Sequence, residues 1–300
     1  MKRNGRLSVA VLGAGLIGVD LVAKVLRSDS LDLRLVVGRS TDAPGLRQMT
    51  RMGLPVSTDG VASLVDPADP FDVAFDATNA MSHAEHAERL RPLGTMLVDL
   101  TPSKVGRMVV PTVNGTDVLS HPDVSDVNMV SCGGQASIPV LHAIARRHRI
   151  DYVEVVTTAA TLSVGRSTRL NLDEYVETTQ EAVREFTGVK DVKSILNLSP
   201  ASPPATFRVA MSLLGDDLEP DSVRSAVAEA AHGLRAFVGG YDVTACTVDG
   251  GRAFIAVQVT AGGDRIPKYA GNLDIINSAA LHVAEQYAAD RLSTAGAETS

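Results

Sequence analysis

Cys132 is the side chain of this 300-residue sequence whose surroundings point most directly to chemistry. It lies where an apolar stretch, 128–132, is followed by two glycines and then by a helical pattern. A thiol at the start of a helix is close to unpaired backbone N–H groups and to the positive end of the helix dipole, and both favour the thiolate. The position therefore predicts a nucleophile, although a free cysteine can also be a small buried hydrophobic residue.

A glycine motif near the N-terminus predicts a dinucleotide-binding loop. It directly follows a predicted buried strand at 7–12 and precedes a predicted helix at 19–27. Its residues are Gly13, Ala14, Gly15, Leu16, Ile17 and Gly18. In such a loop the glycines allow a tight turn, leave room for a pyrophosphate and let the helix pack closely on the strand. A nicotinamide dinucleotide combined with a nucleophilic thiol predicts oxidation of an aldehyde through an enzyme-bound thioester.

The segment after the second predicted strand, 33–37, leaves the choice between NAD and NADP open. A free ribose 2′-hydroxyl usually binds an acidic residue about 20 residues after the glycines, and Asp42 is near that position. Arg39 and Ser40 come just before it and could instead bind a 2′-phosphate, because a guanidinium group matches phosphate geometry.

The order of the predicted elements indicates an α/β protein with a Rossmann-type, doubly wound parallel sheet plus an α+β domain. Short buried strands at 7–12, 33–37, 72–76 and 95–100 alternate with helical stretches, which is typical of the parallel sheet. After Cys132, long strands with few helices predict a largely antiparallel sheet covered on one face. The helices expected there span 136–148, 172–186 and 220–237, and the strands span 152–162, 207–214, 243–248 and 253–261.

We place the dinucleotide-binding domain at residues 1–131 and 272–292, and the second domain at 132–271. The final predicted helix, 273–289, has no strand after it and is expected to pack back on the first domain. The small, polar residues 293–300 are expected to form a flexible tail. Asn171 is expected to cap the helix that follows it.

Composition limits the possible partners. The net charge is −7 and the longest basic cluster is 146–149, so we expect no binding of nucleic acid or of an anionic membrane surface. No window reaches the roughly 20 apolar residues of a membrane span. Cys132 and Cys246 alone make no disulfide framework, which favours a cytoplasmic protein.

No metal site is predicted. His83 and His86 share a predicted helix with Glu85 and Glu88, but no cysteine or further histidine at ligand spacing completes a site. We therefore expect these side chains on a solvated face of the helix.

Four segments together resemble the acylating acetaldehyde dehydrogenases of aromatic-compound catabolism. The segments are Asp99–Pro102, Asn128–Ala136, Glu177–Thr179 and Tyr269–Ile275. The resemblance runs from about residue 8 to about residue 287. It implies a Rossmann domain joined to an α+β domain for catalysis and dimerisation, which agrees with the predicted elements. It also implies a homodimer that works beside a 4-hydroxy-2-oxovalerate aldolase.

The resemblance implies that Cys132 is the acyl-thioester nucleophile and that Asn272 lies near the nicotinamide, although Asn272 could simply cap the last helix. The backbone N–H groups of Gly133 and Gly134 are candidates for an oxyanion site. A second cofactor segment of the family aligns with residues 163–171. The matching residues, which we carry over, are Ser163, Gly165, Thr168, Arg169 and Asn171.

The activity that the resemblance implies converts acetaldehyde, or another short aldehyde, with coenzyme A and NAD to acyl-CoA and NADH. NAD is the usual cofactor of the family, and NADP is the alternative. A phosphate-dependent semialdehyde dehydrogenase would share the fold class and the cysteine nucleophile. A non-catalytic, cofactor-binding partner of an aldolase is the third hypothesis.

The sequence departs from the family pattern at four positions in three segments. Leu162 replaces a lysine, and Arg166-Ser167 replaces a Pro-Gly pair, which changes the backbone freedom of a cofactor loop. Val209 replaces an aspartate thought to assist the catalytic thiol, and valine cannot exchange a proton. Either another group assists Cys132, or turnover is altered, or the acyl substrate differs. We expect the pKa of the Cys132 thiol to exceed that of aspartate-bearing relatives.

Overall fold

A computed structural model of the chain describes residues 5–263 and 265–297, without the side chains of Ser167 and of residues 294–297. The chain forms two compact units: unit 1 contains residues 1–129 and 277–300, and unit 2 contains residues 130–276. The expected domain boundaries, after residue 131 and before residue 272, therefore differ by a few residues. The second boundary falls inside the last helix, α9 (Gly271–Ala297). Because the same helix continues across it, the pattern of apolar and polar residues does not change there.

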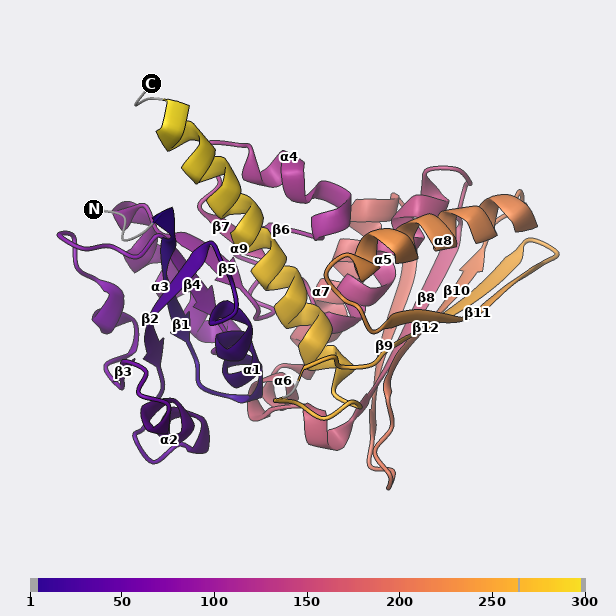
Figure 1. Ribbon diagram of the computed structural model, residues 1–300. Coiled ribbons are helices and arrows are strands. Elements are labelled where there is room, and N and C mark those ends of the chain that lie inside the picture. The colour runs from indigo at the N-terminus through magenta and orange to yellow at the C-terminus, as the bar shows by residue number, and fades with distance from the viewer. Residues whose placement is uncertain (1–4, 264, 298–300) are drawn as a thin grey trace. The chain divides into compact units, whose positions relative to one another are not determined.

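Unit 1 contains, within the described residues, a seven-stranded parallel sheet in the order β3-β2-β1-β4-β5-β7-β6 (Figure 1). Its strands are β1 (Leu7–Leu12), β2 (Leu31–Val37), β3 (Val56–Ser57), β4 (Val73–Asp76), β5 (Met96–Asp99), β6 (Arg107–Met108) and β7 (Asp126–Asn128). Its helices are α1 (Leu16–Val25), α2 (Pro44–Arg51), α3 (Ala80–Leu90), α4 (Thr116–Leu119) and most of α9, with shorter helical turns at Gly60–Leu64, Arg91–Leu93 and Pro111–Gly115. The predicted doubly wound sheet is confirmed, and its strand order reverses between β1 and β4, where such sheets bind ligands.

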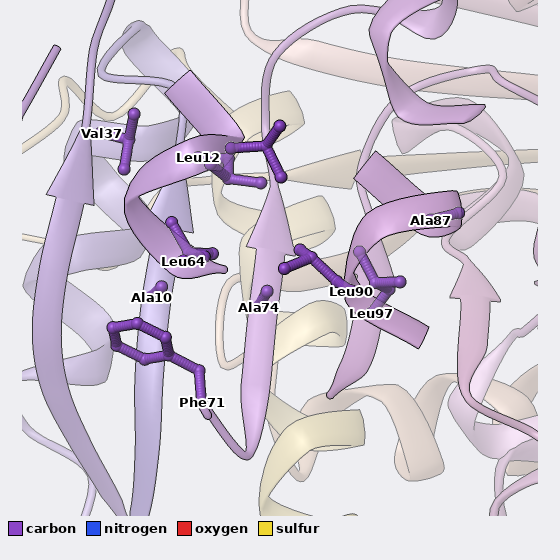
Figure 2. Packing of buried hydrophobic residues seen from close by; sticks show 10 residues of the cluster. Ala10, Leu12, Val37, Leu64, Phe71, Ala74, Ala87, Leu90 and Leu97 are labelled. Atoms are coloured by element: carbon purple, nitrogen blue, oxygen red, sulfur yellow. The ribbon is translucent and has the colours of Figure 1, made fainter. Parts of the chain in front are cut away.

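The strands of unit 1 are apolar because a parallel sheet is covered on both faces. One buried cluster joins Leu12 of β1, Ala74 of β4 and Leu97 of β5 to the helical turn at Gly60–Leu64. In Figure 2, Leu90 of α3 lies beside Leu97. Full burial of such a side chain contributes roughly 1.5–3 kcal/mol. This packing fixes the carboxyl ends of β1, β4 and β5, where the polar loops begin.

Unit 2 contains, in the part of the chain that is described, a five-stranded sheet in the order β11-β12-β10-β8-β9. Its strands are β8 (Tyr152–Ala160), β9 (Asp191–Ser199), β10 (Phe207–Leu214), β11 (Tyr241–Asp249) and β12 (Arg252–Val259). Its helices are α5 (Cys132–Ala145), α6 (Arg166–Leu170), α7 (Leu172–Thr187) and α8 (Pro220–Arg235), and Figure 1 shows α5 and α8 along one face of the sheet. The β8–β9 pair is parallel and the other pairs are antiparallel, so the predicted largely antiparallel sheet is confirmed.

Several predicted bounds are wrong in detail. Helix α5 begins at Cys132 rather than at 136, because Ser131 caps it and the two glycines continue the helix. Helix α9 reaches Ala297, so residues 293–297 are helical rather than part of a flexible tail, and 298–300 lie outside the described residues. Strand β9 was not predicted, since polar residues interrupt its apolar pattern. Among the described helices, none is long and apolar enough to cross a membrane.

Candidate active site

The chain reaches Cys132 through a sharp change of direction. Val130, with φ of 61°, adopts the left-handed conformation, which is rare for a β-branched residue and costs on the order of 1–3 kcal/mol. Ser131 follows as the N-cap of α5, and its Oγ accepts a hydrogen bond of 2.9 Å from the Gly134 N–H. Ser131 Oγ is also 2.7 Å from Thr179 Oγ1 of α7. Cys132 is thus the first residue of a capped helix, as the sequence predicted.

The Cys132 thiol lies beside a phenol. Its Sγ is 3.4 Å from the Oη atom of Tyr175, a residue of α7. The Gly133 N–H donates a hydrogen bond of 3.0 Å to the same Oη. Burial raises the pKa of the Cys132 thiol, while the Tyr175 hydroxyl and the backbone N–H groups of Cys132 and Gly133 act in the opposite direction. Within the described residues, the groups that are hydrogen-bonded to the thiol are therefore neutral: a phenol and backbone N–H groups.

The predicted oxyanion site needs correction. The Gly133 N–H donates to Tyr175 Oη, and the Gly134 N–H donates to Ser131 Oγ. Both groups are therefore already paired, and an oxyanion would have to displace a hydroxyl oxygen to use either. The sequence could not show this, because neither partner oxygen is part of the glycine motif.

Thr157 and Tyr175 leave no room for a side chain at position 133. A Cβ on Gly133 would collide with Thr157 Oγ1 and would lie 2.6 Å from Tyr175 Oη, so glycine is required there. Thr157 is buried in β8, and its Oγ1 has no hydrogen-bond partner among the described residues. Val209, which is also buried, is paired with Thr157 across β8 and β10. Paired residues point to the same face of a sheet, so the side chain of residue 209 shares the face of Thr157.

The glycine loop of unit 1 fits a pyrophosphate. Gly13 has φ of 102°, and a Cβ there would collide with the carbonyl of Ala77, just after β4. A Cβ on Gly18 would collide with the Gly13 carbonyl, whereas a Cβ on Gly15 would meet nothing within 4 Å. Gly15 is the N-cap of α1 and provides no side chain, so the first N–H groups of that helix remain available to an anion. The loop lies where the strand order reverses.

The remaining residues of this loop are less constrained. Leu16 is 46% exposed, while the Ile17 carbonyl accepts a hydrogen bond of 3.1 Å from Asn277 of α9. The Ala14 carbonyl lies so close to Gly45 that a Cβ on Gly45 would collide with it. After β2, Arg39 is exposed, so its guanidinium group can reach a ligand from solvent.

In unit 2 the structure brings together two predicted cofactor segments that are 109 residues apart. Asn272 Nδ2 donates a hydrogen bond of 2.9 Å to the Ser163 carbonyl. The buried Asn272 Oδ1 has no hydrogen-bond partner among the described residues. Asn272 is the second residue of α9 rather than its cap. A buried, unpaired amide oxygen fits an amide donor such as the carboxamide of a nicotinamide ring.

The other carried-over residues of unit 2 shape the same segment. Arg169 folds back on it and donates to the carbonyls of Thr161, at 2.6 Å, and Val164, at 3.2 Å. Gly165 is the N-cap of α6, which contains Thr168, and a Cβ on Gly165 would meet nothing within 4 Å. Asn171 lies at the N-cap position of α7, as predicted. Its side chain does not make the cap hydrogen bond that was expected there.

Comparison with known proteins agrees with this arrangement. The family described as "Prokaryotic acetaldehyde dehydrogenase, dimerisation" matches residues 132–267. An acetaldehyde dehydrogenase of Streptomyces griseus is 53% identical over 282 residues, which are 94% of this chain and 90% of that protein. The chain belongs to the acetaldehyde dehydrogenase family. A Geobacillus stearothermophilus member is 38% identical over 290 residues, which are 96% and 98% of the two chains.

Solved structures support the fold of this family member. A crystal structure of aspartate semialdehyde dehydrogenase II from Vibrio cholerae matches with a TM-score of 0.69 at 13% sequence identity, covering 95% of this chain and 99% of that one. A second crystal structure of that enzyme, in complex with ASA, matches with a TM-score of 0.65 at 13% identity, covering 93% and 97%. At this identity the likeness concerns the fold alone.

In this acetaldehyde dehydrogenase family member, His83 and His86 do not lie on a solvated helix face, so that prediction is wrong. Both are buried, with exposures of 0% and 7%, and do not face solvent. They belong to a group that we call the histidine cluster. Its members are Asp76, His83, His86, Arg91, Asp99 and Asp126, all in unit 1.

Hydrogen bonds hold the histidine cluster together. The Nδ1 atoms of His83 and His86 lie 2.8 and 2.6 Å from the same Oδ2 of Asp76. His83 Nε2 is 3.1 Å from Asp126, which also accepts a hydrogen bond of 2.6 Å from Arg91. A carboxylate can only accept, so both ring nitrogens of His83 carry protons and the ring is an imidazolium.

The pKa values of the cluster follow from these contacts. Burial alone would lower the pKa of His83, but the hydrogen bonds to Asp126 and Asp76 and the charge of Asp99 raise it to about 10. Burial alone would raise the pKa of Asp76, but the hydrogen bonds from His83 and His86 hold it well below its usual value. Burial raises the pKa of Asp99 to about 6, against the charge of His83. The charged forms of His83 and Asp76 thus stabilise each other.

Three residues of the cluster have the side-chain types that bind metals. Atoms of Asp76, His83 and His86, one from each, lie within 4.8 Å of one another in the described part of the chain. The Nδ1–Oδ2 distances of 2.6 and 2.8 Å are nevertheless those of hydrogen bonds. Two ligands of one tetrahedral zinc ion, each about 2.0–2.1 Å from it, would be roughly 3.3 Å apart. The geometry is therefore that of an ion cluster.

One signal in the sequence could have located this cluster. Asp76 and Asp99 are the last residues of β4 and β5 and are paired in register. Carboxylates that end neighbouring parallel strands lie on the same edge of a sheet, so they require buried partners. The helix that follows Asp76 provides His83 and His86.

Proposed function

We propose that the protein is an acylating aldehyde dehydrogenase in which Cys132 forms a thioester with the acyl group of a short aldehyde and transfers it to coenzyme A. The observation that carries this proposal is the position of Cys132 as the first residue of a capped helix, next to the hydroxyl of Tyr175. A glycine loop suited to a pyrophosphate and 53% identity to an acetaldehyde dehydrogenase support it.

In the proposed reaction the Cys132 thiolate attacks the carbonyl carbon, a carbon–sulfur bond forms, and an electron pair moves to the carbonyl oxygen. A bound nicotinamide cofactor supplies the two-electron acceptor that takes the hydride. The carbonyl double bond then re-forms, and the acyl group stays on Sγ. The thiol of coenzyme A attacks this thioester, Cys132 leaves as a thiolate, and the proton of the attacking thiol passes to water.

Two segments are proposed to bind the cofactor. The loop of residues 13–18 would hold the pyrophosphate on backbone N–H groups, and Asn272 Oδ1 would accept from the carboxamide. We propose NAD as the cofactor, with NADP as the alternative that Arg39 would favour. If Arg39 binds a 2′-phosphate, Arg39→Ala weakens NADP selectively, by about 1–3 kcal/mol. Equal losses for both cofactors would reject that role.

The proposed assembly is a homodimer formed through unit 2, because the matching dimerisation family covers residues 132–267. An aldolase that produces the aldehyde is a further proposed partner. Light scattering of the purified chain would test the dimer. Co-purification with a 4-hydroxy-2-oxovalerate aldolase would test the second partner.

The test of the activity mixes the protein with acetaldehyde, either NAD or NADP, and either coenzyme A or inorganic phosphate, while reduced cofactor is followed. Turnover that requires coenzyme A is expected. Turnover with phosphate alone would favour a phosphate-dependent semialdehyde dehydrogenase. If stopped-flow absorbance shows no burst of reduced cofactor under any condition, the protein is a non-catalytic cofactor-binding partner.

A further inference from the structure

Tyr175 brings a buried hydroxyl group to the sulfur atom that the proposed function uses. Its Oη is 3.4 Å from Cys132 Sγ, and the residue is only 5% exposed. Within the described residues, this hydroxyl is the one side-chain group that is hydrogen-bonded to the thiol. Tyr175 reaches the thiol from α7, which packs against α5. Because 43 residues separate it from Cys132, no local motif predicts this contact.

The hydrogen-bonding capacity of Oη restricts what this hydroxyl can do. A phenol has one proton and two lone pairs, and the Gly133 N–H occupies one lone pair. The other lone pair can accept from the thiol when Cys132 is protonated. A thiolate can only accept, so after ionisation the phenol must donate. A rotation of the O–H bond makes this exchange without moving a heavy atom.

Thr157 provides the second partner that this rotation needs. A Cβ on Gly133 would collide with Thr157 Oγ1 and would lie 2.6 Å from Tyr175 Oη. The two oxygens are therefore next to the same point of the backbone. Thr157 is fully buried, and its Oγ1 has no hydrogen-bond partner among the described residues. It can therefore accept the phenol proton while Cys132 is a thiol, and donate to Oη once the phenol has turned to the sulfur.

We propose that Tyr175 is a catalytic residue that donates a hydrogen bond to the Cys132 thiolate, both before the sulfur attacks and when it leaves during acyl transfer. This proposal rests on the proposed function, in which Cys132 is the nucleophile. On ionisation the thiol proton passes to water and its bonding pair stays on sulfur, while the phenol keeps its own proton throughout. Burial raises the pKa of Tyr175 well above its usual value, so the group is a donor and not a base.

This role also provides the assistance that Val209 cannot give. Val209 lies opposite Thr157 on the neighbouring strand and offers neither a proton nor an acceptor. The chain instead stabilises the charge of the sulfur from α7, with a neutral donor. A neutral donor stabilises the thiolate without adding a second negative charge to a buried site.

The test compares Tyr175→Phe with the parent protein, both carrying Cys246→Ala so that Cys132 is the only thiol. Iodoacetamide alkylation is measured against pH in the absence of aldehyde, cofactor and coenzyme A. A hydrogen bond to a charged group changes the thiol pKa by about one to two units, so the alkylation midpoint of Tyr175→Phe is expected to rise by that amount.

Tyr241→Phe is the matched control. It also removes one buried hydroxyl that is bonded to α5, because Tyr241 Oη donates a hydrogen bond of 2.8 Å to the Ala136 carbonyl. This hydroxyl does not contact Cys132, so the alkylation midpoint is expected to stay at the parent value. Circular dichroism and thermal unfolding show whether both variants fold.

The pH dependence of activity gives a second readout. Tyr175→Phe is expected to lose about tenfold or more in kcat/KM near pH 7 and to approach the parent protein as pH rises, because at high pH the thiol ionises without help. A folding defect would lower the activity by the same factor at every pH. An unshifted alkylation midpoint in Tyr175→Phe would overturn the role of Tyr175 alone. Full activity of Cys132→Ala would overturn the proposed function, and the catalytic role of Tyr175 with it.

Discussion

The histidine cluster of unit 1 and the thiol site of unit 2 (Cys132, Gly133, Thr157, Tyr175 and Val209) are both largely buried, but they differ in the charge of their polar groups. The cluster contains three aspartates. The Asp76 carboxylate is hydrogen-bonded to His83 and His86. The Asp126 carboxylate is hydrogen-bonded to His83 and Arg91. In the thiol site the groups are neutral, and the hydroxyl of Tyr175 lies beside the Cys132 thiol and the Thr157 hydroxyl. A network of paired charges specifies one arrangement, whereas neutral hydroxyl groups can exchange hydrogen-bond partners by rotating the O–H bond.

This difference assigns the two regions to different tasks. The Asp76 Oδ1 atom accepts from the Thr78 N–H at 3.0 Å, and Asp99 Oδ1 accepts from the Thr101 N–H at 2.7 Å. The histidine cluster thereby fixes the loops that follow β4 and β5, at the edge of the sheet where a dinucleotide would bind. It is a scaffold, and the thiol site is where bonds would change.

The largest expected effect is a loss of acyl transfer without a loss of stability. Cys132→Ala should lower acyl transfer by at least about a thousandfold, because no other group can form the thioester. The unfolding free energy and the binding of the nicotinamide cofactor should stay near the parent values. Cys246→Ala, in β11, is the control and should keep most of the activity. Acyl transfer at the parent rate in Cys132→Ala would refute the mechanism.

A substitution in the histidine cluster should lower stability. His83→Leu should destabilise unit 1 by about 3–5 kcal/mol, since it leaves buried carboxylates without their cation. Hydrogen exchange should accelerate in peptides from β4 and β5 and stay unchanged in peptides from β8 and β10. Arg89→Ala is the control on the same helix: its ion pair with Glu85, at 3.4 Å, is exposed and contributes at most about 0.5 kcal/mol. Equal effects of the two variants would remove the distinction between cluster and surface.

The histidine cluster should also give the stability a characteristic pH dependence. The folded-state pKa of His83, about 10, is above its ordinary value of 6.5, so the folded chain binds the extra proton between these values. The stabilisation is complete below pH 6.5 and is lost as pH rises towards 10, by at most about 1.4 kcal/mol per pH unit. Urea unfolding of the parent protein and of His83→Leu at several pH values between 6.5 and 10 should therefore converge. Parallel curves would mean that His83 is not an imidazolium in the folded state.

Local patterns in the sequence predicted most of the framework. Strand β10 covers the predicted residues 207–214, and the glycine loop follows a buried strand as the motif requires. The start of a helix at Cys132 followed from an apolar run that ends in glycines, although the predicted bound at 136 was late. Each of these features depends on neighbours within a few residues, and such information is contained in one segment.

The contacts that give the two regions their character depend on distant residues. Tyr175 looks like an ordinary apolar position of α7 until the fold brings it to Cys132. His83 and His86 look like polar positions of an exposed helix until α3 lies against Asp76 and Asp126. A single sequence does not encode such pairings in its periodicity. The paired strand-end aspartates 76 and 99 were the one local sign that the helix had buried partners.

The smallest expected effect comes from making the thiol site more like the histidine cluster. Val209→Asp places a carboxylate on the sheet face of Thr157, whose Oγ1 has no partner in the described structure. A carboxylate there can take the thiol proton, so that the proton stays in the site while the sulfur carries the charge. We expect kcat/KM at pH 7 to rise by about tenfold, corresponding to about 1.4 kcal/mol, with no gain at a pH where the thiol is already ionised. Val209→Asn has nearly the same shape without the base and should give no gain. If Val209→Asp and Val209→Asn have the same pH profile, proton transfer at this position does not limit the reaction. An alkylation midpoint of Cys132 well below pH 7 in the parent protein would lead to the same conclusion, because the existing neutral donors would then already keep the thiol ionised.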